Sequence, residues 1–144
     1  MIEKFLVKTD YLRKNQNNNK LKILDCRWYI TDSQKGSKEY NEGHIPSAIF
    51  VDIEKFSKSD SLLPHTMVSN YEFKKQVSKL GIHNNDELIV YDQEGFFSSS
   101  RIWYMFRSFG HKNIKILDGG YRQWRKNYEI SCKIPNYAPS TYKS

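Results

Sequence analysis

The segment formed by residues 87–110, ELIVYDQEGFFSSSRIWYMFRSFG, constrains the fold more than any other part of the chain. Residues 88–91 are a short apolar run with β-branched side chains, which is typical of a buried strand. An apolar stripe at helical spacing follows and ends at a glycine, and Ser98 and Ser99 are the expected caps of that helix. The segment therefore predicts a strand, a loop and a helix, with Asp92 directly after the strand.

The rest of the chain alternates in the same way. Further strands are expected at residues 5–7, 22–26, 48–51 and 114–117, and further helices at residues 9–15, 69–80 and 121–126 and just before Gly43. The helix at 69–80 has the clearest local signals, because Ser69 and Glu72 form a capping box and Gly81 follows its end. Strands separated by helices predict an α/β fold, in which a parallel sheet carries helices on both faces.

Length and composition set the outer limits. The chain has 144 residues, which is one domain, and we expect it to occupy residues 1–131, with residues 132–144 as the start of an interdomain linker or a tail. The longest apolar runs are too short for a membrane span, and the N-terminus does not resemble a signal peptide. The two cysteines, Cys26 and Cys132, are too few for a disulfide scaffold, which favours the reducing cytoplasm.

The chain is basic, with a formal net charge of +7. Residues 101–126 hold seven Lys or Arg and one acid, Asp118, and so carry +6 of it. Such a stretch can attract a small anion or nucleic acid, but a solvated surface is the simpler interpretation. No nucleic-acid signature accompanies it, so nucleic acid is not an expected partner.

One candidate nucleophile follows the strand at residues 22–26. Cys26 lies beside Arg27 at a strand end, where a lowered thiol pKa would make it reactive. No helix N-terminus follows directly, so we favour a buried core position for Cys26, which is where free cysteine is usually found. Asp25 and Arg27 are expected to fix loops by hydrogen bonds, and Cys132 to play no part.

The four histidines show no spacing typical of a metal site, and no metal is predicted. His44 precedes a proline and is expected to hold a turn in place. His65 lies in a loop with few packing demands, so a functional role there is plausible. His83 and His111 follow helix-ending glycines and are expected at the surface.

Five motifs, in order, give the chain a resemblance to a known family: ILDCRW, EYNEGHIPSAIFVDIE, LPHTM, the segment at residues 87–111, and KILDGGYRQW. Together they resemble the rhodanese family, in particular the N-terminal domain of two-domain thiosulfate and 3-mercaptopyruvate sulfurtransferases. The resemblance implies a five-stranded, mainly parallel sheet flanked by helices and no cofactor. The motif residues expected to be structural are Asp25, Arg27, His44, Arg101, Gly119 and Gly120; as a phosphate cradle the two glycines are a weak candidate.

The resemblance also implies a role. In that family the second domain carries a cysteine at the strand end equivalent to Asp92, and this cysteine takes up sulfane sulfur and passes it to a thiophilic acceptor. A carboxylate cannot do so, and the chain therefore resembles the non-catalytic first domain. The matching positions imply that His65 and Glu54 face the substrate, a small sulfur-containing anion. The implied partner is a second rhodanese domain, whose linker would begin where this chain ends.

Two alternatives stay open. The chain could be a stand-alone sulfur carrier that uses Cys26 or Cys132, or a regulatory interaction module without sulfur chemistry. The residues around Asp92 add two expectations of their own. Its carboxylate is expected to accept N–H bonds as a built-in anion, and Phe96 and Phe97 are expected to form an exposed loop tip that a partner covers.

Overall fold

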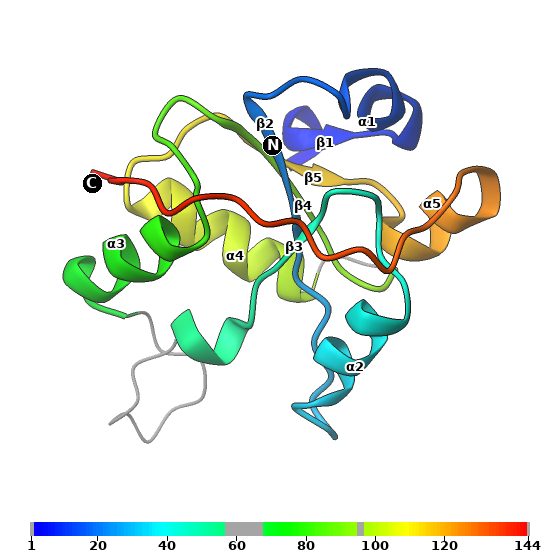
Figure 1. The fold of residues 1–144 in the computed structure, drawn as a ribbon, viewed down its shortest axis with the longest axis horizontal. Coiled ribbons are helices and arrows are strands. Elements are labelled where there is room, and N and C mark those ends of the chain that lie inside the picture. The colour runs from blue at the N-terminus through cyan, green and yellow to red at the C-terminus, as the bar shows by residue number, and fades with distance from the viewer. Residues whose placement is uncertain (1, 57–67, 95–96, 144) are drawn as a thin grey trace.

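The chain forms a five-stranded sheet in a computed structural model that describes residues 2–56, 68–94 and 97–143 (Figure 1). The strand order is β1-β5-β4-β2-β3, and every neighbouring pair is parallel. The strands are β1 (Leu6–Val7), β2 (Leu21–Asp25), β3 (Ile49–Phe50), β4 (Glu87–Tyr91) and β5 (Ile114–Leu117). The α/β fold expected from the sequence is confirmed.

Helices cover both faces of this sheet. The α-helices are α1 (Thr9–Asn15), α2 (Lys35–Glu42), α3 (Asn70–Lys79), α4 (Phe97–Ser108) and α5 (Gly120–Asn127), with short 3-10 helices η1 (Ile2–Phe5) and η2 (Ile53–Phe56). Helices α3 and α4 lie on one face, and α1, α2 and α5 lie on the other (Figure 1). Within the described ranges no helix is both long and apolar enough to cross a bilayer.

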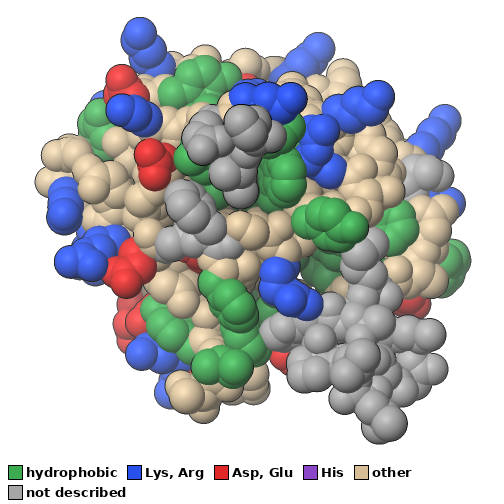
Figure 2. Space-filling view, turned by 180° about the vertical axis from the view of Figure 1, so that it is seen from behind, with side chains coloured by type: hydrophobic (Ala, Val, Ile, Leu, Met, Phe, Trp, Pro, Cys, Tyr) green, Lys and Arg blue, Asp and Glu red, His purple; other side chains and the backbone are tan. Residues whose placement is uncertain are grey.

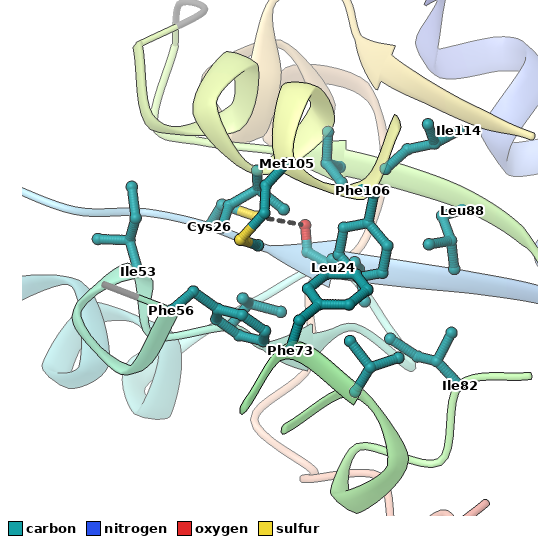
Figure 3. Close-up of a cluster of buried hydrophobic side chains, with 14 of the residues drawn as sticks. Leu24, Cys26, Ile53, Phe56, Phe73, Ile82, Leu88, Met105, Phe106 and Ile114 are labelled. Carbon is teal, nitrogen blue, oxygen red and sulfur yellow. Dashed lines mark hydrogen bonds between the residues drawn. The ribbon is translucent and has the colours of Figure 1, made fainter. Parts of the chain in front are cut away.

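Two apolar clusters fill the space between the sheet and its helices. Alternate residues of each buried strand serve different clusters: Leu24 faces the cluster under α3 and α4, whereas Ile23 faces the cluster under α1, α2 and α5. In the first cluster the rings of Phe73 and Phe106 meet edge to face at 5.1 Å (Figure 3). In the second, Trp124 of α5 is fully buried. The sheet is therefore buried on both sides, as a parallel sheet requires.

The helix predicted at residues 69–80 begins as its capping box indicates. The Ser69 hydroxyl accepts a hydrogen bond from the backbone N–H of Glu72 at 3.2 Å. Gly81 follows the helix with a φ of 80°, a conformation that suits glycine.

After α5 the chain runs back across the domain instead of leaving it (Figure 1). Ser131 pairs with His44, and Ser140 donates its backbone N–H to Ser78 in α3 at 2.9 Å. Tyr142 is buried and lies 5.8 Å, centroid to centroid, from Phe73. In the present chain, this C-terminal segment therefore packs against the rest of the domain.

This C-terminal segment overturns one expectation. His111 was expected at the surface and is instead buried. Its ring lies between the hydroxyl of Tyr142, 2.8 Å from Nδ1, and the carbonyl oxygen of Asp86, 2.9 Å from Nε2. Local sequence placed His111 after a helix end, but residues from the C-terminus cover it.

Candidate functional site

The loops that follow β2 and β4 lie side by side at the carboxyl edge of the sheet. The two strands pair in register, with Asp25 opposite Tyr91, and Cys26 donates its backbone N–H to the Tyr91 carbonyl oxygen at 2.7 Å. In open α/β sheets, ligands bind beyond the carboxyl ends of strands. This edge is therefore where a site is expected, and Asp92 and Arg27 belong to it.

Asp92 is buried and caps α4. Its Oδ2 accepts hydrogen bonds from the backbone N–H of Ser99 at 3.0 Å and from the Ser99 hydroxyl at 2.9 Å. A carboxylate at a helix N-terminus is favoured because the free N–H groups there carry partial positive charge. Ser98 and Ser99, expected as caps, instead lie inside the first turn of α4, and the cap comes from the loop.

The backbone around Asp92 is fastened to α5 as well. Tyr121 donates its N–H to the Asp92 carbonyl oxygen at 2.9 Å, and Arg122 donates to that of Gln93 at 3.0 Å. Gly120 allows this approach: its φ is 60°, and a Cβ there would lie 2.6 Å from the Asp92 carbonyl oxygen. Two N–H groups at the start of α5 are thus used by protein carbonyls, which disfavours a phosphate cradle at Gly119.

Asp25 and Arg27 form a buried ion pair that joins three segments. Arg27 Nη2 donates to Asp25 Oδ2 at 2.8 Å and to the Gly43 carbonyl oxygen at 2.7 Å. The Tyr91 hydroxyl donates to the same Asp25 oxygen at 2.6 Å. Burial, reinforced by the Asp25 carboxylate, raises the pKa of Tyr91 well above its usual range. The pair holds the loops after β2 and α2 in place against β4.

The two cysteines occupy opposite environments. Cys26 is fully buried in the apolar cluster with Met105 and Phe106 around it, and its thiol contacts the Leu24 carbonyl oxygen (Figure 3). Burial, with the charges of Asp25 and Asp92, raises the pKa of the Cys26 thiol well above its usual value. Cys132 is exposed in the C-terminal segment. The Cys26 thiol is therefore a poor nucleophile, because the thiolate is the reactive form and a raised pKa disfavours it.

His44 is fully engaged within the protein. Its side chain is buried, Nδ1 lies 2.8 Å from the Tyr40 carbonyl oxygen and Nε2 lies 2.8 Å from that of Lys133. Its ring also stacks on Tyr40, with centroids 4.0 Å apart. With both ring nitrogens hydrogen-bonded, His44 ties α2 to the C-terminal segment and has no nitrogen available for a metal or a substrate.

The remaining residues proposed from the sequence are either exposed or outside the described ranges. Glu54 is exposed in η2, where its backbone N–H bonds the Asp52 carboxylate at 3.0 Å. Arg101 is exposed on α4. His65 and Phe96 lie outside the described residues. The expectation that His65 and Glu54 face the same substrate therefore stays a prediction.

One feature of this edge was missed by the sequence analysis. Trp28 and Phe97 stack with their ring centroids 5.9 Å apart, and Gln93 donates to the Trp28 carbonyl oxygen at 2.9 Å. Phe97 is the first residue of α4, not a loop tip, and remains 57% exposed. The pair Phe96–Phe97 was the only sequence signal for an aromatic surface here, and it did not point to Trp28.

The basic charge is spread over the face of the molecule seen in Figure 2. On this face, Lys and Arg side chains lie both at the rim and nearer the middle, without merging into one patch. This distribution is that of a solvated surface.

The chain is similar to known proteins over nearly its whole length. A model of the rhodanese-like domain matches residues 8–127. The thiosulfate/3-mercaptopyruvate sulfurtransferase 1, mitochondrial, of Arabidopsis thaliana is 44% identical over 127 residues, covering 87% of this chain and 34% of that protein. The thiosulfate sulfurtransferase of Rattus norvegicus is 34% identical over 146 residues, covering 96% of this chain and 49% of that protein.

The solved structures agree on the fold. SseA from Escherichia coli, described with the fold of 3-mercaptopyruvate sulfotransferases, superposes with a TM-score of 0.89 at 32% identity, covering 94% of this chain and 53% of that one. The chain thus spans between a third and a half of the length of the curated relatives named above.

Proposed function

This chain belongs to the rhodanese family, and from that premise we propose that it is a non-catalytic rhodanese domain of a sulfurtransferase. The parent activity would move sulfane sulfur from thiosulfate or 3-mercaptopyruvate to a thiophilic acceptor. Relatives named for that activity, each about two to three times as long as the matched region, support the proposal.

The observation that carries the proposal is the side chain of Asp92. A catalytic rhodanese domain needs a cysteine thiolate directly after the strand equivalent to β4. The thiolate attacks the outer sulfur of thiosulfate, a persulfide forms, and sulfite leaves with the bonding electrons. Asp92 fills that position with a carboxylate whose Oδ2 already accepts two hydrogen bonds from Ser99. An oxygen anion there offers no route to a persulfide.

Neither cysteine replaces the missing thiol. Cys26 is enclosed by apolar side chains and its raised pKa keeps it protonated. Cys132 is exposed but follows α5, the last helix among the described residues, so it does not open a helix whose N-terminus would stabilise a thiolate. The stand-alone carrier is therefore the second candidate, and it rests on the accessibility of Cys132 alone.

The proposed contribution of this domain is a surface for a second rhodanese domain. Phe97 and Tyr104 are 57% and 62% exposed and stand seven residues apart, so they share one face of α4. Interfaces between domains of one chain bury about 600–1,500 Å², and exposed aromatics are favourable anchors for them. His65 and Glu54 are the side chains proposed to face the bound sulfur anion.

A turnover assay tests the proposal. Purified chain is incubated with thiosulfate and cyanide, or with 3-mercaptopyruvate and a thiol, and thiocyanate or pyruvate is measured. We expect no turnover by the chain, because it offers no reactive thiol at the carboxyl edge. Turnover that is abolished by Cys26→Ser or by Cys132→Ser would instead establish the carrier.

For the location of the chain we propose the cytoplasm, where the two free cysteines would stay reduced.

A further inference from the structure

A hollow of about 360 Å³ opens at the carboxyl edge of the sheet, on the face covered by α2 and α5. It lies on the opposite side of the sheet from the α4 surface described above. Its lining includes charged groups from two helices, namely Glu39 and Glu42 of α2 and Arg122 and Arg125 of α5. This volume is at the small end of the range for ligand pockets.

The two walls of the hollow carry opposite charge. Glu39 and Glu42 are three residues apart on α2, and Arg122 and Arg125 are three residues apart on α5, so each pair shares one helix face. In the sequence, the basic residues of α5 are only part of a charged stretch. The fold places them across a hollow from two carboxylates.

The charges do not neutralise each other across the hollow. Glu39 accepts a hydrogen bond from the Tyr29 hydroxyl at 2.5 Å, and Arg122 pairs outward with Glu94 at 2.8 Å. Arg125 lies over the ring of Tyr121, 5.5 Å from its centroid. Among the residues that the structure describes, Glu42 and Arg125 take part in no ion pair. One carboxylate and one guanidinium thus face the space between the helices with no ionic partner in the described residues.

The base of the hollow is rigid. Arg27, which lines it, is fixed by Asp25 and by the Gly43 carbonyl oxygen. Gly43 lines it too, and a Cβ at this position would lie 2.8 Å from the Ile130 side chain and 3.0 Å from the Tyr121 hydroxyl. The base of the site is therefore formed before any ligand arrives, and a ligand would not have to order it.

We propose that this hollow binds a small zwitterion of the free α-amino acid class. A simple anion would meet the carboxylates of α2, and a simple cation would meet the guanidinium groups of α5. A molecule that carries an ammonium and a carboxylate a few bonds apart satisfies both walls, with its carboxylate on Arg125 and its ammonium on Glu42. Ile130 and the ring of Tyr121 offer apolar surface to a side chain. This binding function is separate from the proposed role in sulfur transfer.

A titration of the purified chain with L-leucine tests the proposal, with chemical shifts of backbone amides followed by NMR at constant ionic strength. N-acetyl-L-leucine lacks the ammonium, and L-leucinamide lacks the carboxylate. We expect saturable shifts at Gly43, Gln93 and Arg122 with L-leucine, and affinity at least about tenfold lower for each analogue, which is the cost of losing one charge-assisted hydrogen bond.

Matched variants locate the site. Glu42→Gln and Arg125→Gln are expected to lower the affinity for L-leucine at least about tenfold, whereas Lys126→Gln, a neighbour on α5 outside the hollow, leaves it unchanged. Absence of saturable shifts with L-leucine would overturn the proposal. An affinity for either analogue equal to that for L-leucine would also overturn it, as would binding that survives both variants. The analogue comparison uses the unmodified chain, so it stands even if a variant folds poorly.

Discussion

The Asp92 carboxylate and Ser99 are joined by two hydrogen bonds to a single oxygen, one from the backbone N–H at 3.0 Å and one from the hydroxyl at 2.9 Å. The loop after β4 is thereby closed onto the first turn of α4 by the side chain that we propose to stand at the nucleophile position. In that proposal, an anion already occupies the place where a catalytic domain would hold a thiolate. The side chain of residue 92 therefore decides which chemistry is possible directly after β4.

The first prediction replaces this anion with sulfur. In a chain carrying Cys26→Ser and Cys132→Ser, Asp92→Cys should give a thiol at the N-terminus of α4, where the helix dipole lowers its pKa below the free value of about 8.5. Alkylation rates measured over a pH series should then exceed those of Cys132 in the unmodified chain at neutral pH. A thiol that titrates like free cysteine would show that this loop is no anion cradle. The fold assignment would be unaffected.

The second prediction concerns the buried ion pair. Arg27→Ala leaves the Asp25 carboxylate buried without its cation, and the free energy of unfolding should fall by about 3–5 kcal/mol. Urea unfolding followed by tryptophan fluorescence measures the change. The exposed pair Arg122–Glu94 is the matched control, since Arg122→Ala should cost at most about 1 kcal/mol. Equal effects of the two substitutions would contradict the structural role assigned to Arg27.

The elements of the fold were predictable because their signals are local. Ser69 and Glu72 mark the start of α3 within one turn, and the apolar run of β4 fixes that strand by itself. The carboxyl-edge placement of Asp92 also follows from local pattern, because the residue after a parallel strand lies at that edge whatever the rest of the chain does.

The features that could not be predicted from the sequence depend on contacts between residues far apart in the chain. His111 is covered by Tyr142, 31 residues further along the chain. The start of α4 was misplaced because its cap is Asp92, seven residues before Ser99, and not a neighbouring serine. The stacking of Trp28 on Phe97 joins the loop after β2 to the start of α4, and only the sheet brings these two segments together. Such pairings are tertiary, and propensity and spacing carry no information about them.

The third prediction follows from His111. Burial lowers its pKa, so the folded chain binds this proton less readily than the unfolded chain, in which histidine titrates near 6.5. The contribution of neutral His111 is therefore complete above about pH 6.5 and is lost as the pH falls below that value towards the folded-state pKa. The free energy of unfolding should fall over this window.

A matched pair of variants isolates this effect. His111→Gln should reduce the decline in stability between neutral and mildly acidic pH, whereas His83→Gln, at an exposed histidine, should leave it as it is. Urea unfolding at a series of pH values measures both. If stability declined by the same amount in the unmodified chain and in both variants, the decline would come from groups other than His111.

The fourth prediction concerns the aromatic surface on α4. Phe97 and Tyr104 are exposed, and we expect the chain to self-associate weakly through them. Sedimentation velocity over a concentration series should show association that Phe97→Ser weakens. Tyr71→Ser, at an equally exposed aromatic on α3, is the control and should have no effect. A chain that stays monomeric throughout would argue against an interface at this surface.

The central claim is that this domain takes up no sulfur itself, and intact-mass spectrometry after incubation with thiosulfate tests it most directly. A catalytic domain would gain the mass of one sulfur atom as a persulfide, and a reducing agent would remove it. We predict an unmodified mass for the chain, because Asp92 is the residue proposed to stand at the nucleophile position and Cys26 is buried with a raised pKa. A stoichiometric, reducible gain of one sulfur that disappears in Cys26→Ser or Cys132→Ser would contradict the account.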